Sequence, residues 1–127
     1  MYFTFNNANS KDFNIKIKKS NHLSIPRRKL EFIEVQGKTD NLIIDEGSRE
    51  MLEIEIEAFI DCRGSSTKDY VSRHDSWLNS STGYKDLVFD DNTTLKAIFV
   101  GQIDFNSITK NFEEILLQFK AYREGDL

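Results

Sequence analysis

Apolar and polar residues alternate most regularly between Met51 and Cys62. The apolar positions of this run are Leu52, Ile54, Ile56, Ala58, Ile60 and Cys62. A period of two over this length is typical of a strand with one buried face and one solvated face. The other face carries Glu53, Glu55 and Glu57, and three like charges in a row favour basic neighbours across the sheet. The Lys and Arg residues between positions 16 and 29 are the candidates for those neighbours.

Shorter runs predict further strands at residues 2–5, 13–18, 30–36, 86–89, 95–105 and 112–122. Pro26 excludes a helix before the run at 30–36 and favours an extended entry into it. Breaks at Gly37–Asp40 and Asp45–Ser48 separate that run from the strand at Met51. The turn Asp90–Thr93 joins its two flanking strands into a β-hairpin.

One helix is predicted over about residues 67–79. Ser66–Asp69 has the form of a capping box, with Asp in place of the usual Glu or Gln. The apolar or aromatic side chains that then recur at helical spacing are Tyr70, Val71, His74, Trp77 and Leu78. Strands before and after a single helix predict an α+β fold: a mainly antiparallel β-sandwich with one packed α-helix and a β-hairpin. We expect a single domain over residues 1–127.

Composition and charge narrow the classes of function. The 127 residues are 39% hydrophobic and 30% charged, as expected for one soluble globular domain. A formal net charge of −4 provides no basic face for nucleic acid. No apolar run approaches the ~18 residues of a membrane span. Cys62 is the only cysteine, which excludes an intramolecular disulfide and favours folding in a cytoplasm.

The sequence contains no arrangement of residues typical of catalysis. His22 and His74 stand in unrelated contexts, and we expect His74 to be a packed or hydrogen-bonded histidine. Cys62 ends an apolar alternation, where a free thiol behaves as a small hydrophobe. Asp90–Asn92 could chelate calcium, but acidic residues are common in hairpin turns. We therefore predict no catalytic residue, no cofactor and no metal, and a protein that is not an enzyme.

Four segments carry a resemblance to a known family. They are Phe3–Ile15, Pro26–Asp40, Trp77–Asp91 and Leu117–Tyr122. In order and spacing they resemble the N-terminal domain of siphovirus distal tail proteins. The first three segments are similar to that family's patterns "F-N-G … S-x-D-F-G-L", "P-x-R-x-x-E-x-I-x-V-P-G-R-D-G" and "W-L … G … L-x-F-x-D". The fourth segment is similar to the family's final strand. Gln36 stands where the family often has proline, and Asn41 where it has a second glycine.

The resemblance implies a structural role in a virion. Members of this family form six-subunit rings that join the tail tube to the baseplate or receptor-binding apparatus. The implied partners are further copies of the chain and other phage tail proteins (tail tube, tail hub or baseplate). The implied location is the virion tail tip, after synthesis in the bacterial cytoplasm. Ring closure needs different patches on the two sides of a subunit, and charges of opposite sign can orient neighbours. The candidate contact residues are Arg27, Arg28, Lys38, Asp40, Glu53, Glu55 and Glu57.

Two other functions remain open from the residues alone. A β-sandwich could bind carbohydrate, with Phe59, Tyr70 or Tyr84 as stacking platforms. A small hydrolase could use Asp and Glu side chains, but nothing in the sequence positions a substrate or raises a pKa.

Overall fold

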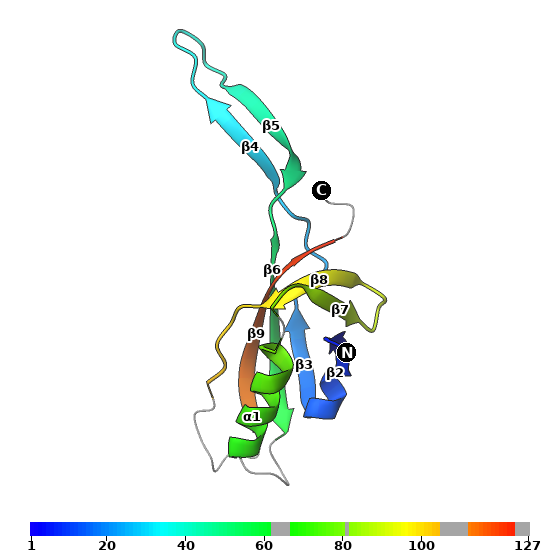
Figure 1. Ribbon diagram of the computed structural model, residues 1–127. Helices are drawn as coiled ribbons and strands as arrows, with labels where there is room; N and C mark the ends of the chain where they lie inside the picture. The colour runs from blue at the N-terminus through cyan, green and yellow to red at the C-terminus, as the bar shows by residue number, and fades with distance from the viewer. Residues whose placement is uncertain (62–66, 81, 105–111, 124–127) are drawn as a thin grey trace.

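The computed structural model describes residues 1–61, 67–80, 82–104 and 112–123 of the chain (Figure 1). Figure 1 shows a body, built from most of the strands and the helix, and a two-stranded hairpin that projects away from it. We call this hairpin the arm. The elements are β1 Phe3–Phe5, β2 Ala8–Asn9, the 3-10 turn η1 Ser10–Phe13, β3 Ile15–Ser20, β4 Arg28–Ile33, β5 Leu42–Arg49, β6 Leu52–Asp61, α1 Thr67–Leu78, β7 Lys85–Phe89, β8 Thr94–Phe99 and β9 Phe112–Tyr122.

The body is a seven-stranded antiparallel sheet with the strand order β2-β1-β7-β8-β9-β6-β3. Its longest ladder joins β6 to β9, from Leu52 opposite Ala121 to Asp61 opposite Phe112. Two strands separate β1 from β9 in the sheet, yet the ring centroids of Phe5 in β1 and Phe119 in β9 lie 4.9 Å apart. The sheet is therefore curled. The core therefore lies between the two halves of the sheet, and the predicted α+β class is confirmed.

The predicted alternation in β6 is confirmed. Leu52, Ile54, Ile56, Ala58 and Ile60 are all buried, whereas Glu53 and Glu55 are exposed. Cys62 lies outside the described residues. The predicted final strand also matches the bounds of β9, and its apolar positions are buried: Ile115, Leu117, Phe119 and Ala121. The predicted hairpin between β7 and β8 forms in antiparallel register.

Helix α1 packs against the body through its aromatic side chains. The Trp77 ring stacks on Phe13 at 4.1 Å, and its Nε1 donates a hydrogen bond of 2.7 Å to the carbonyl of Phe5. Tyr70, His74 and Leu78 are buried with it, as their spacing predicts. Val71 is exposed instead, because it lies at the edge of the buried stripe. The predicted cap at Ser66 lies outside the described residues.

Several strand boundaries differ from the sequence prediction. The strand predicted at residues 30–36 is β4, Arg28–Ile33. Strand β3 begins at Ile15 rather than at Phe13, because η1 occupies Ser10–Phe13 and Asn14 then adopts a left-handed backbone with φ of 58°. Strand β8 ends at Phe99 rather than at position 105. The backbone N–H of Val100 still donates to the Gln118 carbonyl, and the chain then leaves the sheet. Phe105 itself lies outside the described residues.

The predicted break at Asp45–Ser48 is wrong. Strand β5 runs through it, and the ladder passes from Leu30 opposite Asp45 to Arg28 opposite Arg49. Residues 46–48 therefore bulge opposite a single residue of β4. Gly47 supplies the left-handed backbone of this bulge, with φ of 78°. The predicted turn at Gly37–Asp40 does form, and it connects β4 to β5 at the free end of the arm.

Candidate interaction surface

The arm is a separate two-stranded sheet in which β4 pairs with β5. Among the described residues, neither strand hydrogen-bonds to a second strand along its outer edge. Figure 1 shows the arm extending away from the body, which covers neither of its faces along most of its length. A hairpin of this kind is marginally stable in water by itself, because it lacks a surface on which to bury side chains.

Apolar side chains lie on both faces of the arm. Phe32 and Ile43 stand directly opposite each other in the ladder, and 58% and 59% of their surfaces are exposed. The next pair, Ile33 and Leu42, points to the other face, because successive residues of a strand alternate. Both of these side chains are exposed as well. The free half of the arm thus presents apolar surface in two directions, which is typical of a segment that is covered by a partner.

Sequence reasoning missed this surface. It predicted the strand that contains Phe32 but not the strand Leu42–Arg49 that pairs with it. The signal that could have found the second strand is the apolar run Leu42–Ile44, which follows directly on the glycine turn that begins at Gly37.

The predicted contact residues fall in three separate places. Arg27 and Arg28 lie at the root of the arm, where the Arg27 carbonyl accepts a hydrogen bond from the Glu50 N–H. Lys38 and Asp40 lie in the turn at its free end. The structure brings neither pair against the acidic residues of β6. Part of the basic charge is balanced inside the arm, because Arg28 Nη1 lies 3.7 Å from Asp45 Oδ2.

Glu53, Glu55 and Glu57 form an acidic strip on the solvent face of β6, in the body. The predicted basic neighbours are present in part. Lys19 of β3 is the register partner of Glu57, and Lys120 of β9 is the register partner of Glu53. The strip therefore has basic neighbours on both sides, and the one on β9 comes from outside the range that the sequence indicated.

The aromatic residues considered for carbohydrate stacking do not form one platform. Tyr70 is buried, and its hydroxyl accepts a hydrogen bond from Asn14 Nδ2. Tyr84 is exposed and lies against Met51, with its hydroxyl 3.4 Å from Sδ. Phe59 lies eight residues beyond Met51, or about 26 Å along an extended chain at 3.3 Å per residue. Tyr84 and Phe59 therefore lie near opposite ends of β6.

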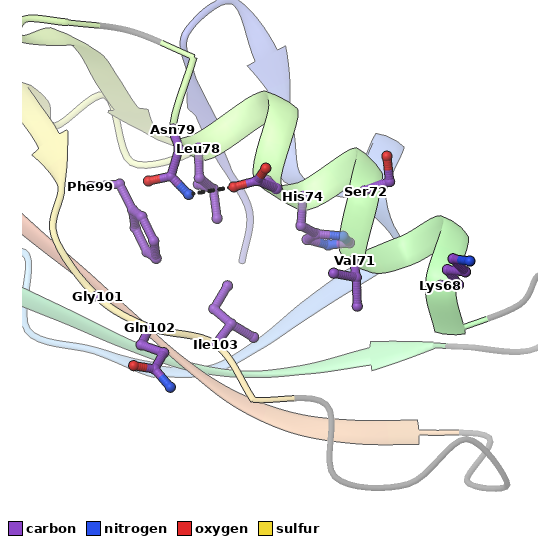
Figure 2. A pocket seen from close by; sticks show the side chains of 11 residues that line it. Lys68, Val71, Ser72, His74, Leu78, Asn79, Phe99, Gly101, Gln102 and Ile103 are labelled. Atoms are coloured by element: carbon purple, nitrogen blue, oxygen red, sulfur yellow. Dashed lines mark hydrogen bonds between the residues drawn. The ribbon is translucent and has the colours of Figure 1, made fainter.

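A groove of about 610 Å³ runs between α1 and the segment that follows β8 (Figure 2). Val71, Leu78, Phe99 and Ile103 supply its apolar lining. His74 lies on its helix side, and its Nδ1 donates a hydrogen bond of 2.6 Å to the Tyr70 carbonyl. Burial lowers the pKa of His74 below its usual value, so the ring is neutral near pH 7. This is the packed, hydrogen-bonded histidine that the sequence predicted.

The described residues contain neither a candidate metal site nor a candidate membrane-spanning helix. Within them, no group of three or more His, Cys, Asp or Glu side chains is arranged to hold a metal ion. The helix in this part of the chain is too short and too polar to cross a membrane.

Comparison with known proteins identifies the fold. No family model and no curated protein matches the chain. Its fold is similar to that of a hub protein from a phage adsorption apparatus. The solved structure is that of the SPP1 Dit (gp 19.1) protein, described as a paradigm of the hub adsorption apparatus in phages that infect Gram-positive bacteria. The TM-score is 0.78 at 14% sequence identity, over 98% of this chain. The match spans half of the SPP1 chain (50%).

Proposed function

We propose that this chain is a structural component of a bacteriophage or prophage tail tip. It assembles with copies of itself into a ring. In the siphovirus family that the chain resembles, this ring has six subunits. The ring joins the tail tube to the baseplate or receptor-binding apparatus. The observation that carries this proposal is an arm whose two faces both expose apolar side chains. The similarity of the fold to a phage hub protein supports it.

The arm needs a covering surface, and a neighbouring copy supplies one. Full burial of a Phe, Leu or Ile side chain stabilises by about 1.5–3 kcal/mol. Phe32, Ile33, Leu42 and Ile43 together therefore provide several kcal/mol when a neighbour covers the arm. This gain offsets the entropy that association removes.

The two edge strands of the seven-stranded sheet are poor sites for pairing with another copy, which favours the arm as the contact. Strand β3 forms one edge of the seven-stranded sheet and carries Lys16, Lys18 and Lys19, which oppose pairing with another strand. Strand β2, at the other edge, has two residues. Among the described strands, β5 of the arm has the longest open edge, with eight residues. A contact between the arm of one copy and a different surface of the next is heterologous, and such contacts close into a ring when the rotation permits.

Charged residues orient the neighbours in this proposal. Arg27 and Arg28 lie at the arm root of one copy, and the acidic strip of β6 lies on the body of another. Attraction between them selects the register of the contact more than it adds affinity. Lys38 and Asp40, at the free end of the arm, are placed to make the farthest contact from their own body.

Static light scattering after size exclusion tests the proposal. The wild-type chain is compared with the arm variant Phe32→Ser/Ile43→Ser and with Val71→Ser, a control at an exposed apolar position on α1, outside the proposed contact surfaces. We expect a discrete oligomer from the wild type and the control, and a monomer from the arm variant. A wild-type chain that stays monomeric at all concentrations contradicts the proposal. An arm variant that assembles like the wild type contradicts it too.

A further inference from the structure

The root of the arm is fastened to the body around His22, in the segment between β3 and β4. The His22 side chain is 3% exposed, and its ring stacks on Phe89 of β7 at 3.9 Å and 10°. Its Nε2 donates a hydrogen bond of 2.8 Å to Oδ2 of Asp91, in the turn between β7 and β8. Its Nδ1 lies 2.9 Å from the Ser20 hydroxyl. An aromatic stack and two polar contacts therefore fix this ring in both position and rotation.

Two further side chains hold the same segment. Arg123, just after β9, places Nη2 2.8 Å from the Ser24 carbonyl and 3.5 Å from the His22 carbonyl. Asn21 pairs with the backbone of β6 through both ends of its amide. Its Nδ2 donates to the Glu53 carbonyl at 3.0 Å, and its Oδ1 accepts from the Glu55 N–H at 2.7 Å. Strands β6 and β7 and the residue that follows β9 thus all contribute to holding one connecting segment.

This arrangement matters because of how the arm is attached. Two residues, Glu50 and Met51, separate β5 from β6, whereas residues 21–27 separate β3 from β4. A short link and a long link together allow the arm to swing unless the long link is held. The contacts of Asn21, His22 and Arg123 remove that freedom, because each is directional and each joins the long link to a different part of the body.

We propose that Asn21, His22 and Arg123 form a clamp that sets the direction of the arm in the free subunit. The purpose that we assign to the clamp rests on the proposed function. An arm that already points toward its neighbour loses less conformational entropy on assembly. Asp91 takes part as the partner that fixes His22. The clamp is a positioning device, and its direct effect is on the single subunit, before any ring exists.

Pulsed electron paramagnetic resonance on the monomer tests the clamp. Spin labels are placed at Lys38→Cys on the arm and Lys85→Cys on the body, in a Cys62→Ser background. The arm variant Phe32→Ser/Ile43→Ser keeps the chain monomeric. We expect a narrow distance distribution with the clamp intact. His22→Ala/Arg123→Met should broaden it by about twofold or more, because the long link is released.

Two further variants keep the test independent of folding and of ring formation. Arg123→Met alone removes two hydrogen bonds to backbone carbonyls and leaves the His22 stack in place, and it should broaden the distribution by a smaller factor. Arg73→Met is the matched control, because Arg73 donates to the Asp12 carbonyl at 2.8 Å, outside the clamp. A distribution that is already broad in the intact clamp, or that neither His22→Ala/Arg123→Met nor Arg123→Met alone changes, overturns the proposal. Absence of a ring would contradict the proposed function and leave this result unaffected.

Discussion

Trp77 of α1 donates an indole hydrogen bond of 2.7 Å to the backbone carbonyl of Phe5, 72 residues away in the sequence. The same indole stacks on Phe13 with an angle of 8° between the rings. One side chain thus joins the helix to β1 and to η1 by both packing and a buried hydrogen bond. Trp77 therefore contributes both packing and a hydrogen bond to the attachment of α1 to the body.

Replacing Trp77 should separate these two contributions. Trp77→Phe keeps much of the ring contact but leaves the buried Phe5 carbonyl without its donor, which costs about 1–3 kcal/mol. Trp77→Ala also creates a cavity and should lower the free energy of unfolding by about 3–5 kcal/mol. Urea unfolding followed by circular dichroism measures both values. Equal losses for the two variants would show that packing contributes nothing at this position.

The burial of His74 should make stability depend on pH. Its pKa is lowered in the folded state, chiefly by desolvation, whereas the unfolded chain takes up a proton near 6.5. The unfolded state therefore gains protons first, and stability should fall as the pH drops below about 6.5. His74→Gln removes this titration, so the difference in urea midpoint between pH 7 and pH 5 should shrink. An unchanged difference in the variant would assign the pH dependence to other groups.

Asp91 should titrate abnormally low. Hydrogen bonds from His22 and then from Thr93 lower its pKa from 3.8 to about 2. Because the folded pKa lies below the unfolded value, the stabilising contribution is complete above about pH 3.8 and is lost as the pH falls toward 2. Carboxyl chemical shifts in an NMR titration measure this pKa directly. In His22→Ala the midpoint should rise toward its ordinary value, and a midpoint that stays near 2 would exclude His22 as the main cause.

Charge reversal at the arm root should weaken assembly. Arg27→Glu/Arg28→Glu replaces the proposed attraction to the acidic strip of a neighbour by repulsion. The loss should be largest at low ionic strength and partly recovered at high salt, since salt screens exposed charges. Lys68→Glu/Lys85→Glu, at exposed positions on α1 and β7, is the control, because two reversals change the net charge by the same amount. Light scattering across a salt series measures the oligomer mass of both variants. Equal assembly of the two variants at low salt would contradict a role of Arg27 and Arg28 in the contact.

Much of the body follows from the sequence. Strand β6 is predictable because one of its faces is buried and the other solvated, so its residues alternate. Helix α1 is predictable from the spacing of Tyr70, His74 and Trp77. The turn η1 has no such signal, because a hydrogen bond from the Lys11 N–H to Asn9 Oδ1 starts it and no periodicity marks it.

The arm could be predicted only in part, for a physical reason. Asp45–Ser48 has the composition of a loop, and pairing across a bulge keeps it in a strand. Phe32 and Ile43 have the same apolar pattern as residues of an internal core. A single sequence does not state whether the surface that covers such residues belongs to the same chain or to another copy. The charged residues of the proposed contact were predicted, and its apolar part was not.

The central claim is that the arm of one copy contacts another copy. Photocrosslinking from a benzoylphenylalanine at position 43, in a mixture of light and isotopically heavy chains, tests it most directly. We predict crosslinked peptides that join light to heavy chains, with position 43 attached to a neighbouring subunit. Crosslinks confined to peptides of one isotope, or none at concentrations where the chain is oligomeric, would contradict the account.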